Sequence, residues 1–164
     1  MIAHARRTEG VDTTNRWVET RRSLPGDRMI RIAATSRRPS GGLIVGWLYL
    51  PNGTPAPGPK FDYKLRWFER LTGYAKALLD SGAPAVLAGD FNVMPTELDV
   101  YAPERWVDDA LFRPEVREAY RRLVAQGWTD ALRVLHPDER IYTFWKYSGT
   151  PLPATPACAS ITCC

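Results

Sequence analysis

The segment Gly89-Asp90-Phe91-Asn92 places a carboxylate and a carboxamide two positions apart, directly after a short apolar run. If that run is a buried strand, both side chains leave its end in the same direction. A carboxylate there can orient a water molecule or hold Mg²⁺, and a carboxamide can bind a phosphate oxygen without adding charge. Gly, Asp and Asn also form ordinary turns, so the segment alone leaves both interpretations open.

Two aromatic segments offer further groups for phosphate or nucleic-acid chemistry. Tyr49 ends another apolar run, just before the turn-forming residues Pro51-Asn52-Gly53. A tyrosine in that position is either a packed aromatic residue or a phenol that faces a ligand. Residues 142–147 place aromatic side chains on both sides of Lys146. This second segment suits an edge strand at the rim of the core, or a surface on which nucleic-acid bases stack.

Strands and helices must position these groups, and the apolar pattern predicts them in alternation. The pattern predicts strands at residues 42–50, 84–88 and 141–145, and helices at residues 61–80 and 114–125. The first helix is predicted from apolar residues spaced for one helical face. The second is predicted from Pro114 in its first turn and Gly127 after its end. Strands and helices in this order indicate an α/β layered architecture.

Composition and charge narrow the class of protein. The chain has 164 residues, enough for one domain with its own core, and its 45% hydrophobic and 24% charged content is typical of a globular protein. Residues 1–40 hold nine Lys/Arg against four Asp/Glu, whereas residues 41–164 hold thirteen against fourteen. The net charge of +4 therefore does not mark a DNA-binding face in the part that has a folding pattern.

The cysteines and the apolar runs exclude other classes. The three cysteines, Cys158, Cys163 and Cys164, all stand in the last seven residues, which matches neither a disulfide framework nor a spaced metal knuckle. No apolar run approaches the roughly 20 residues of a membrane helix, and residues 1–15 do not resemble a signal peptide. We therefore expect a cytoplasmic protein.

Taken together and in this order, the segments resemble the bacterial exonuclease III family over residues 41–147. The residues that carry the resemblance are Tyr49 to Gly53, Lys60 to Lys64 with Trp67, Leu87 to Val93, Thr96 to Tyr101, Asp109 to Phe112, Gly127 to Arg133, His136-Pro137 and Tyr142 to Trp145. The resemblance implies part of a four-layer α/β/β/α fold, in which two facing sheets are flanked by helices. It also implies hydrolysis of DNA phosphodiesters by a magnesium- or manganese-dependent monomer, at abasic sites and stepwise from the 3′ ends of double-stranded DNA.

The resemblance assigns roles to individual residues. Asp90 matches the family's catalytic carboxylate, which orients or deprotonates the attacking water, and Asn92 matches the residue that binds the phosphate and stabilises its developing charge. Both residues supply metal ligands on this pattern. Tyr49 matches the family's active-site tyrosine. Phe144, Trp145 and Lys146 match the aromatic loop that meets the DNA duplex near the abasic nucleotide.

The two ends of the chain depart from the family pattern. Restoring one base after the codon for Asp27 lets residues 28–40 read PDDSHSRYIEAAV, and restoring one after the codon for Tyr147 lets residues 148–164 read FRNAFARDAGLRIDHLL. Both readings resemble the family. We therefore expect three segments: a poorly matched and partly frame-shifted segment at 1–40, the C-terminal half of a nuclease domain at 41–147, and a frame-shifted, disordered tail at 148–164.

This departure makes activity of the chain itself an open point. The family's metal-binding Glu and its terminal Asp-His pair have no counterparts in the matched region, so we expect the chain to be inactive as written. Two alternatives remain. One is a non-catalytic fragment or pseudogene product that binds DNA weakly at most, and the other is a phosphatase or lipid phosphodiesterase of the same superfamily.

Overall fold

The computed structural model of the protein describes residues 2–4, 17–21, 30–35 and 43–144, with side chains described for the last range. The strands are β1 (Ile2–His4), β2 (Trp17–Arg21), β3 (Ile30–Thr35), β4 (Ile44–Tyr49), β5 (Ala85–Asp90) and β6 (Thr129–Asp130). The helices are α1 (Pro59–Asp80), α2 (Pro114–Val124), α3 (Ala131–Leu135) and the short 3₁₀ helix η1 (Pro103–Arg105).

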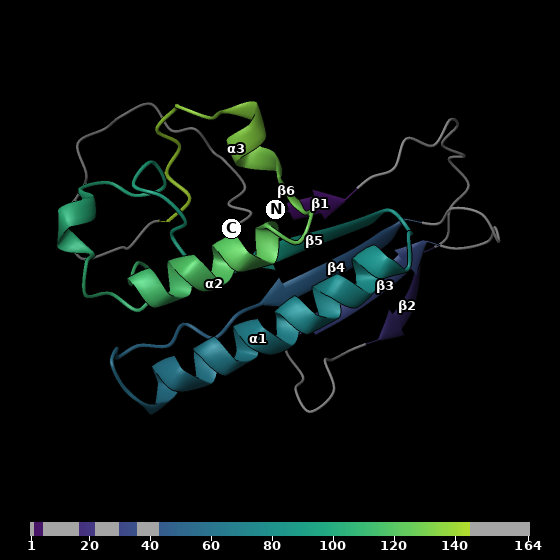
Figure 1. Cartoon of the computed structure of the whole chain (residues 1–164), viewed down its shortest axis with the longest axis horizontal. Helices are drawn as coiled ribbons and strands as arrows, with labels where there is room; N and C mark the ends of the chain where they lie inside the picture. Colours follow the sequence, from purple (N-terminus) through teal and green to yellow (C-terminus); the bar gives the residue numbers. More distant parts are fainter. Residues whose placement is uncertain (1, 5–16, 22–29, 36–42, 145–164) are drawn as a thin grey trace.

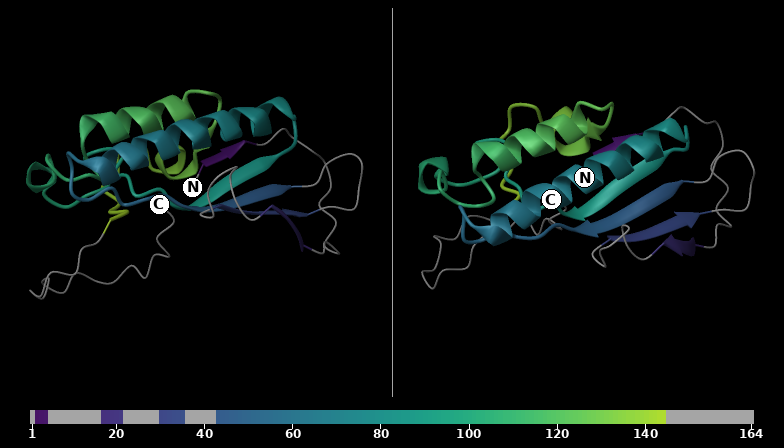
Figure 2. Two further views of the ribbon diagram at one scale, coloured as in Figure 1. Left: turned by 90° about the horizontal axis from the view of Figure 1, so that it is seen from below. Right: turned by 60° about the horizontal axis from the view of Figure 1, so that its bottom comes forward.

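One sheet and one layer of helices make up the described part of the molecule. The sheet has the order β2-β3-β4-β5-β1-β6. Helices α1 and α2 pack against each other and lie on one face of the sheet, as the views in Figure 1 and Figure 2 show. Within the described ranges, no helix combines the length and the apolar character that a membrane crossing requires.

The alternation of side chains along β4 explains which face of the sheet the helices cover. Leu48 and the following Leu50 are fully buried beneath the helices, whereas Trp47 and Tyr49 are 57% and 52% exposed. Because successive side chains of a strand point to opposite faces, burial of the leucines places Trp47 and Tyr49 on the face without helices.

The two long helices begin and end within two residues of the predicted bounds. Both have proline in their first turn, where the missing N–H costs no hydrogen bond, and α1 gives way to Ser81-Gly82. Buried side chains recur at helical spacing on one face of each helix: Phe61, Lys64, Trp67, Phe68, Leu71, Ala75 and Leu78 in α1, and Val116, Ala119, Tyr120 and Leu123 in α2. These stripes form the core between the helices and the sheet.

Helix α1 is the crossover that joins β4 to β5, the only parallel neighbours in the described sheet. Parallel strands need such a long connection because their ends lie at opposite edges. Figure 1 shows β4 pointing towards the end of the molecule at which both α1 and α2 begin. The residues that follow β4 and β5 therefore lie at the same end of the sheet as the first turns of both helices.

Gly89 allows β4 and β5 to approach closely at this end. Its φ of +125° lies in a region that side-chain-bearing residues rarely adopt. A Cβ atom at this position would lie 1.9 Å from the backbone oxygen of Leu48. The sequence Ala88-Gly89-Asp90 is thus required by the strand pairing as well as by the site that follows it.

Most of the predicted elements are confirmed, and one is wrong. The strands at 42–50 and 84–88 and the helices at 61–80 and 114–125 correspond to β4, β5, α1 and α2. The strand expected at 141–145 does not form over residues 141–144. There two single hydrogen bonds hold the backbone instead: Thr143 N donates to the backbone oxygen of Asp99, and the side-chain Nη2 of Arg133 donates to Ile141 O.

The first forty residues contribute β1, β2 and β3, which the apolar pattern did not predict. All three strands pair antiparallel with their neighbours, and β3 continues the sheet from β4. The expected disordered tail at 148–164 lies outside the described residues.

We predict that Gly89→Ala lowers the free energy of unfolding by roughly 3 kcal/mol or more, because the new Cβ meets Leu48 O and the backbone is strained. Chemical denaturation followed by tryptophan fluorescence measures this change. Gly73→Ala is the matched control, since nothing lies within 4 Å of its added Cβ in α1, and it should raise stability by about 0.5–1 kcal/mol. Equal stability of the two variants would contradict the close strand approach.

Candidate active site

Tyr49 and Asp90 end two neighbouring parallel strands and are direct partners in the β4–β5 register. Side chains that are paired in this way leave the sheet on the same face. The tyrosine is half exposed, and Asp90 is partly buried. The pairing continues one step further, because Leu50 N donates to Asp90 O at 2.7 Å. The predicted adjacency of these two strand ends is therefore observed.

Asn92 is held in place by its neighbours on both sides. It is buried, with 6% exposure, and its φ of +46° lies in the left-handed region that asparagine tolerates better than most residues. Its backbone N–H donates to Asp90 Oδ1 at 2.8 Å, and its Nδ2 donates to Leu50 O at 2.6 Å. Asp90 is thus the last residue of β5, and its carboxylate closes a turn at Asn92.

Lys64 reaches the same place from the first half of α1. Its side chain is fully buried, and its Nζ donates to three backbone carbonyls: Asn52 O at 3.0 Å, Asn92 O at 2.5 Å and Ala110 O at 2.9 Å. An ammonium group has three N–H donors and no acceptor, so three carbonyls satisfy it completely. Lys64 therefore joins the turn after β4, the turn after β5 and the segment before α2.

Burial dominates the electrostatics of this lysine. Desolvation lowers the pKa of Lys64 from its ordinary 10.5 to about 7, while the carboxylates of Asp109 and Asp90 act in the opposite direction. Asp109 itself accepts a hydrogen bond from Leu111 N at 2.9 Å.

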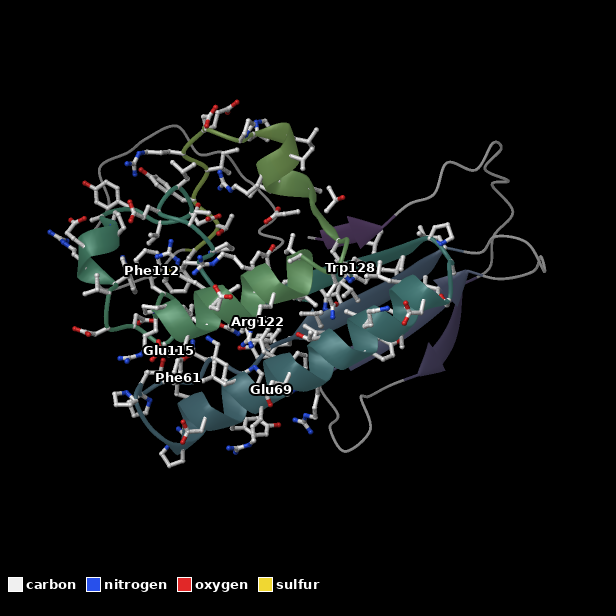
Figure 3. All side chains as sticks on the ribbon, viewed as in Figure 1. Phe61, Glu69, Phe112, Glu115, Arg122 and Trp128 are labelled. Carbon is white, nitrogen blue, oxygen red and sulfur yellow. The ribbon has the colours of Figure 1, made fainter. Side chains whose placement is uncertain are left out.

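Two aromatic residues mark this end of the molecule in Figure 3. Phe61, one turn before Lys64, lies near the start of α1, and Phe112 lies near the start of α2.

The segment that leads to the predicted DNA-binding residues is organised by a buried ion pair. Asp99 is 2% exposed, and its Oδ1 accepts from Arg133 Nη2 at 3.0 Å and from Thr143 Oγ1 at 3.2 Å. Arg133 Nη1 donates to Glu139 O at 2.9 Å and to His136 O at 3.3 Å. Arg133 thus binds the backbone of this segment at His136, Glu139 and Ile141, while Asp99 binds it at Thr143.

The described aromatic residues of this segment pair with the loop around η1. Phe144 packs edge-to-face on Trp106, with ring centroids 5.2 Å apart, and Tyr142 packs in the same way on Tyr101 at 6.0 Å. Tyr101 is 63% exposed. Trp145 and Lys146, the other two predicted DNA-binding residues, lie outside the described residues.

The described residues do not complete a site for a divalent metal ion. Asp90 and Asn92 supply oxygen atoms at the ends of the strands, which gives at most two protein ligands. Within the described ranges, no group of three or more His, Cys, Asp or Glu side chains is arranged to hold a metal. Mg²⁺ prefers six oxygen ligands in near-octahedral array, some of them water. What the geometry does supply is a carboxylate and a carboxamide beside a half-exposed phenol.

The structure brings together Tyr49, Asp90 and Asn92 of the predicted site and adds two groups that sequence reasoning missed. The position of Lys64 in the middle of the apolar stripe of α1 could have indicated a buried lysine. Nothing in the apolar pattern indicates the pair of Asp99 and Arg133, because the two residues are 34 positions apart and meet only in the folded chain.

Comparison with known proteins gives one family. Residues 13–159 match the profile described as the Endonuclease/Exonuclease/phosphatase family. The chain is 38% identical over 100 residues to "DNA repair nuclease APEX1" of Danio rerio, which covers 60% of this chain and 32% of that protein. It is 35% identical over 106 residues to "Exodeoxyribonuclease" of Bacillus subtilis, which covers 64% of this chain and 41% of that protein.

A solved structure shows the same likeness in three dimensions. The AP endonuclease from Archaeoglobus fulgidus superposes with a TM-score of 0.68 at 34% identity, covering 82% of this chain and 50% of that chain. The expected fold class is thereby confirmed: the described sheet and its helices are part of the α/β sandwich of these nucleases. The chain spans half or less of the length of these relatives.

We expect the low pKa of Lys64 to be visible directly by NMR. In protein labelled with ¹³C at lysine Cε, one of the four lysines should titrate near pH 7, because burial disfavours its charged form. The signal is assigned by its absence from Lys64→Met. Titration of every lysine above about pH 9.5, close to the ordinary value, would show that Lys64 is not buried as described.

The Asp99–Arg133 pair should matter far more to stability than an exposed ion pair. Asp99→Ala leaves a mostly buried guanidinium without its carboxylate and should cost about 3–5 kcal/mol in denaturation experiments. Asp80→Ala is the control. It removes the exposed partner of Lys76 in α1 and should cost less than about 0.5 kcal/mol. Similar losses in the two variants would rule out a structural role for the buried pair.

Proposed function

The chain belongs to the Endonuclease/Exonuclease/phosphatase family, and from that premise we propose that it derives from an exodeoxyribonuclease III-type DNA-repair nuclease. The reaction we propose for the intact enzyme is hydrolysis of DNA phosphodiesters, both stepwise from 3′ ends and at abasic sites. One observation carries the proposal: the paired ends of β4 and β5 bring Tyr49, Asp90 and Asn92 to one edge of the sheet.

The roles we propose follow the chemistry of the three groups. Asp90 orients the attacking water or accepts its proton. Its Oδ1 accepts a hydrogen bond from Asn92 N, which fixes the rotamer of the side chain. Among the described residues, none donates a hydrogen bond to its Oδ2. Asn92 presents the carboxamide N–H that is not engaged by Leu50 O to a phosphate oxygen, where charge develops in the transition state. Tyr49 directs its hydroxyl to the scissile phosphate from the neighbouring strand.

We propose magnesium, or manganese in its place, as the cofactor of the intact enzyme. A divalent ion would stabilise charge on the phosphoryl oxygens. Asp90 and Asn92 can each give it one oxygen ligand, and the remaining ligands must come from outside the described residues. The residues described here do not by themselves fit a complete site, so none of the steps above depends on the metal.

Double-stranded DNA with abasic sites or 3′ ends is the substrate we propose. Support comes from relatives, since the Danio rerio protein is named a DNA repair nuclease and the Archaeoglobus fulgidus protein an AP endonuclease. Phe144 is held by Trp106 beside the exposed Tyr101, so the described chain ends in an aromatic surface. We propose that Phe144, Trp145 and Lys146 use stacking and charge to contact the duplex there.

We further propose that the 164-residue chain does not turn over DNA by itself. Its described residues contribute a carboxylate, a carboxamide and a phenol, but fewer metal ligands than the chemistry needs. Loss of acid-base help alone typically costs 10²–10⁴ in rate. A non-catalytic product that binds DNA weakly would be inactive as well. The two possibilities differ in whether cleavage appears once the restored readings and the missing half of the domain are supplied.

The purified chain should show no magnesium-dependent cleavage of an abasic-site duplex. Cleavage should appear when residues 28–40 and 148–164 carry the restored readings and the N-terminal half of a family member is joined to them. In that restored protein, Asp90→Ala should lower the rate by about 10² or more, because the proton acceptor is lost, whereas the exposed Asp62→Ala should not.

Two outcomes would overturn the proposal. Cleavage by the 164-residue chain, abolished by Asp90→Ala so that a contaminant is excluded, would show that it needs no further ligands. A restored protein that folds and binds the duplex without cleaving it would favour the non-catalytic alternative.

A further inference from the structure

Lys64 is the most completely buried charged group among the described residues, and nothing in the proposed chemistry uses it. Its three hydrogen bonds reach chain segments that lie 12, 28 and 46 positions away. A buried ammonium group costs much free energy unless every donor is satisfied, so its place in the core calls for a specific role.

The three acceptors are backbone carbonyls of the segments that shape the candidate site. Asn52 follows β4 and Tyr49, Asn92 follows β5 and Asp90, and Ala110 lies in the segment whose Leu111 O accepts from Met94 N at 2.8 Å. None of these segments is helix or strand at the bonded residue. Because regular backbone pairing is missing there, a side chain must satisfy these carbonyls instead.

Asn92 depends most on this arrangement. Its left-handed backbone conformation, which asparagine tolerates better than most residues, is further fixed by its neighbours. Its N–H donates to Asp90 Oδ1, its carboxamide donates to Leu50 O and accepts from Asn52 Nδ2 at 3.5 Å, and its backbone oxygen accepts from Lys64 Nζ. Of these contacts, the one from Lys64 is the one that fixes the carbonyl end of the Asn92 peptide, so its loss should let that peptide rotate and change the direction of the carboxamide.

The turn after β4 leaves room for the lysine. An added Cβ at Gly53 would lie 2.7 Å from Lys64 Cδ and 3.3 Å from its Cβ, so the lysine stem packs directly on this glycine. Gly53 also has a φ of +85°. Gly53 therefore leaves space for the stem of Lys64, and three carbonyls bind its Nζ. These are two independent features that fit the same side chain.

We propose that Lys64 is a positioning residue of the candidate site, which sets the direction in which Asn92 presents its carboxamide to a phosphate oxygen. This inference rests on the proposed function, because it assigns Lys64 a part in that same site. Lys64 touches no substrate, since its side chain is fully buried. It acts through the peptide of Asn92.

The test compares Lys64→Met with Lys60→Met in the full 164-residue chain. Methionine keeps the length of the stem and removes the three donors, and Lys60 is an exposed lysine one turn earlier on α1. Two quantities are measured by NMR: the hydrogen-exchange rate of the Asn92 carboxamide, and the affinity of inorganic phosphate followed at that carboxamide.

Lys64→Met should speed exchange of the Asn92 carboxamide at least tenfold and weaken phosphate binding at least tenfold, while amides in the middle of α1 and β5 keep their protection. Lys60→Met should change neither quantity by more than about twofold, in line with other exposed substitutions. Unchanged exchange and affinity in Lys64→Met would overturn the proposal.

Gly53→Ala provides a second route, because it displaces the lysine stem without removing the charge or touching Asn92. It should reproduce the faster exchange of the Asn92 carboxamide. If Gly53→Ala and Lys64→Met both lose protection throughout the sheet, Lys64 supports the whole fold and the positioning role is excluded. If phosphate shifts no signal in the unaltered chain but Lys64→Met still frees the carboxamide, the positioning role stands and the phosphate-binding role proposed for Asn92 fails.

Discussion

The close parallel pairing of β4 and β5 is the constraint on which the rest of the site depends. Gly89 leaves no space for a Cβ beside Leu48 O, so the two strands are held together at their last residues. Their register then fixes Tyr49 opposite Asp90. The same pairing requires a long crossover, and α1 supplies it on the covered face of the sheet. Because that helix starts at the end of the sheet where β4 and β5 finish, it can deliver a lysine to the turns that follow both strands.

The site is built from irregular segments, and buried polar side chains replace the backbone pairing that those segments lack. Lys64 holds three carbonyls around the strand ends, and Asp99 with Arg133 holds residues 136–143. Both arrangements bury charged groups, which the protein tolerates because most of their polar atoms are hydrogen-bonded. This explains how a segment without strand structure can still present Phe144 in a defined place against Trp106. Precision at the site therefore comes from buried polar side chains, of which Lys64 lies on α1 and is fixed by the apolar core.

The sequence patterns predicted the elements whose folding is governed by local periodicity. The strands β4 and β5 and the helices α1 and α2 have apolar residues at the spacing of their burial, and prolines or glycines at their ends. The strands β1 to β3 were not predicted, because their own residues show no sustained apolar period. Their formation depends on pairing with strands that are distant in the sequence. The strand expected at 141–145 failed for a related reason: aromatic and β-branched residues favour a strand, but Asp99 and Arg133 take up the backbone groups. Lys64 could have been found from its position in an apolar stripe, although its three acceptors could not.

We propose that the ends of β4 and β5 form the phosphate-facing side of a nuclease site. The most direct test is an NMR titration of the 164-residue chain with an abasic-site DNA duplex, in which amide and carboxamide shifts are mapped onto the structure. The largest changes should fall on Asn92 and on the backbone amides next to Asp90 and Tyr49. Changes confined to another basic surface, such as the exposed Arg121 and Arg122 of α2, with none at the strand ends, would contradict this proposal.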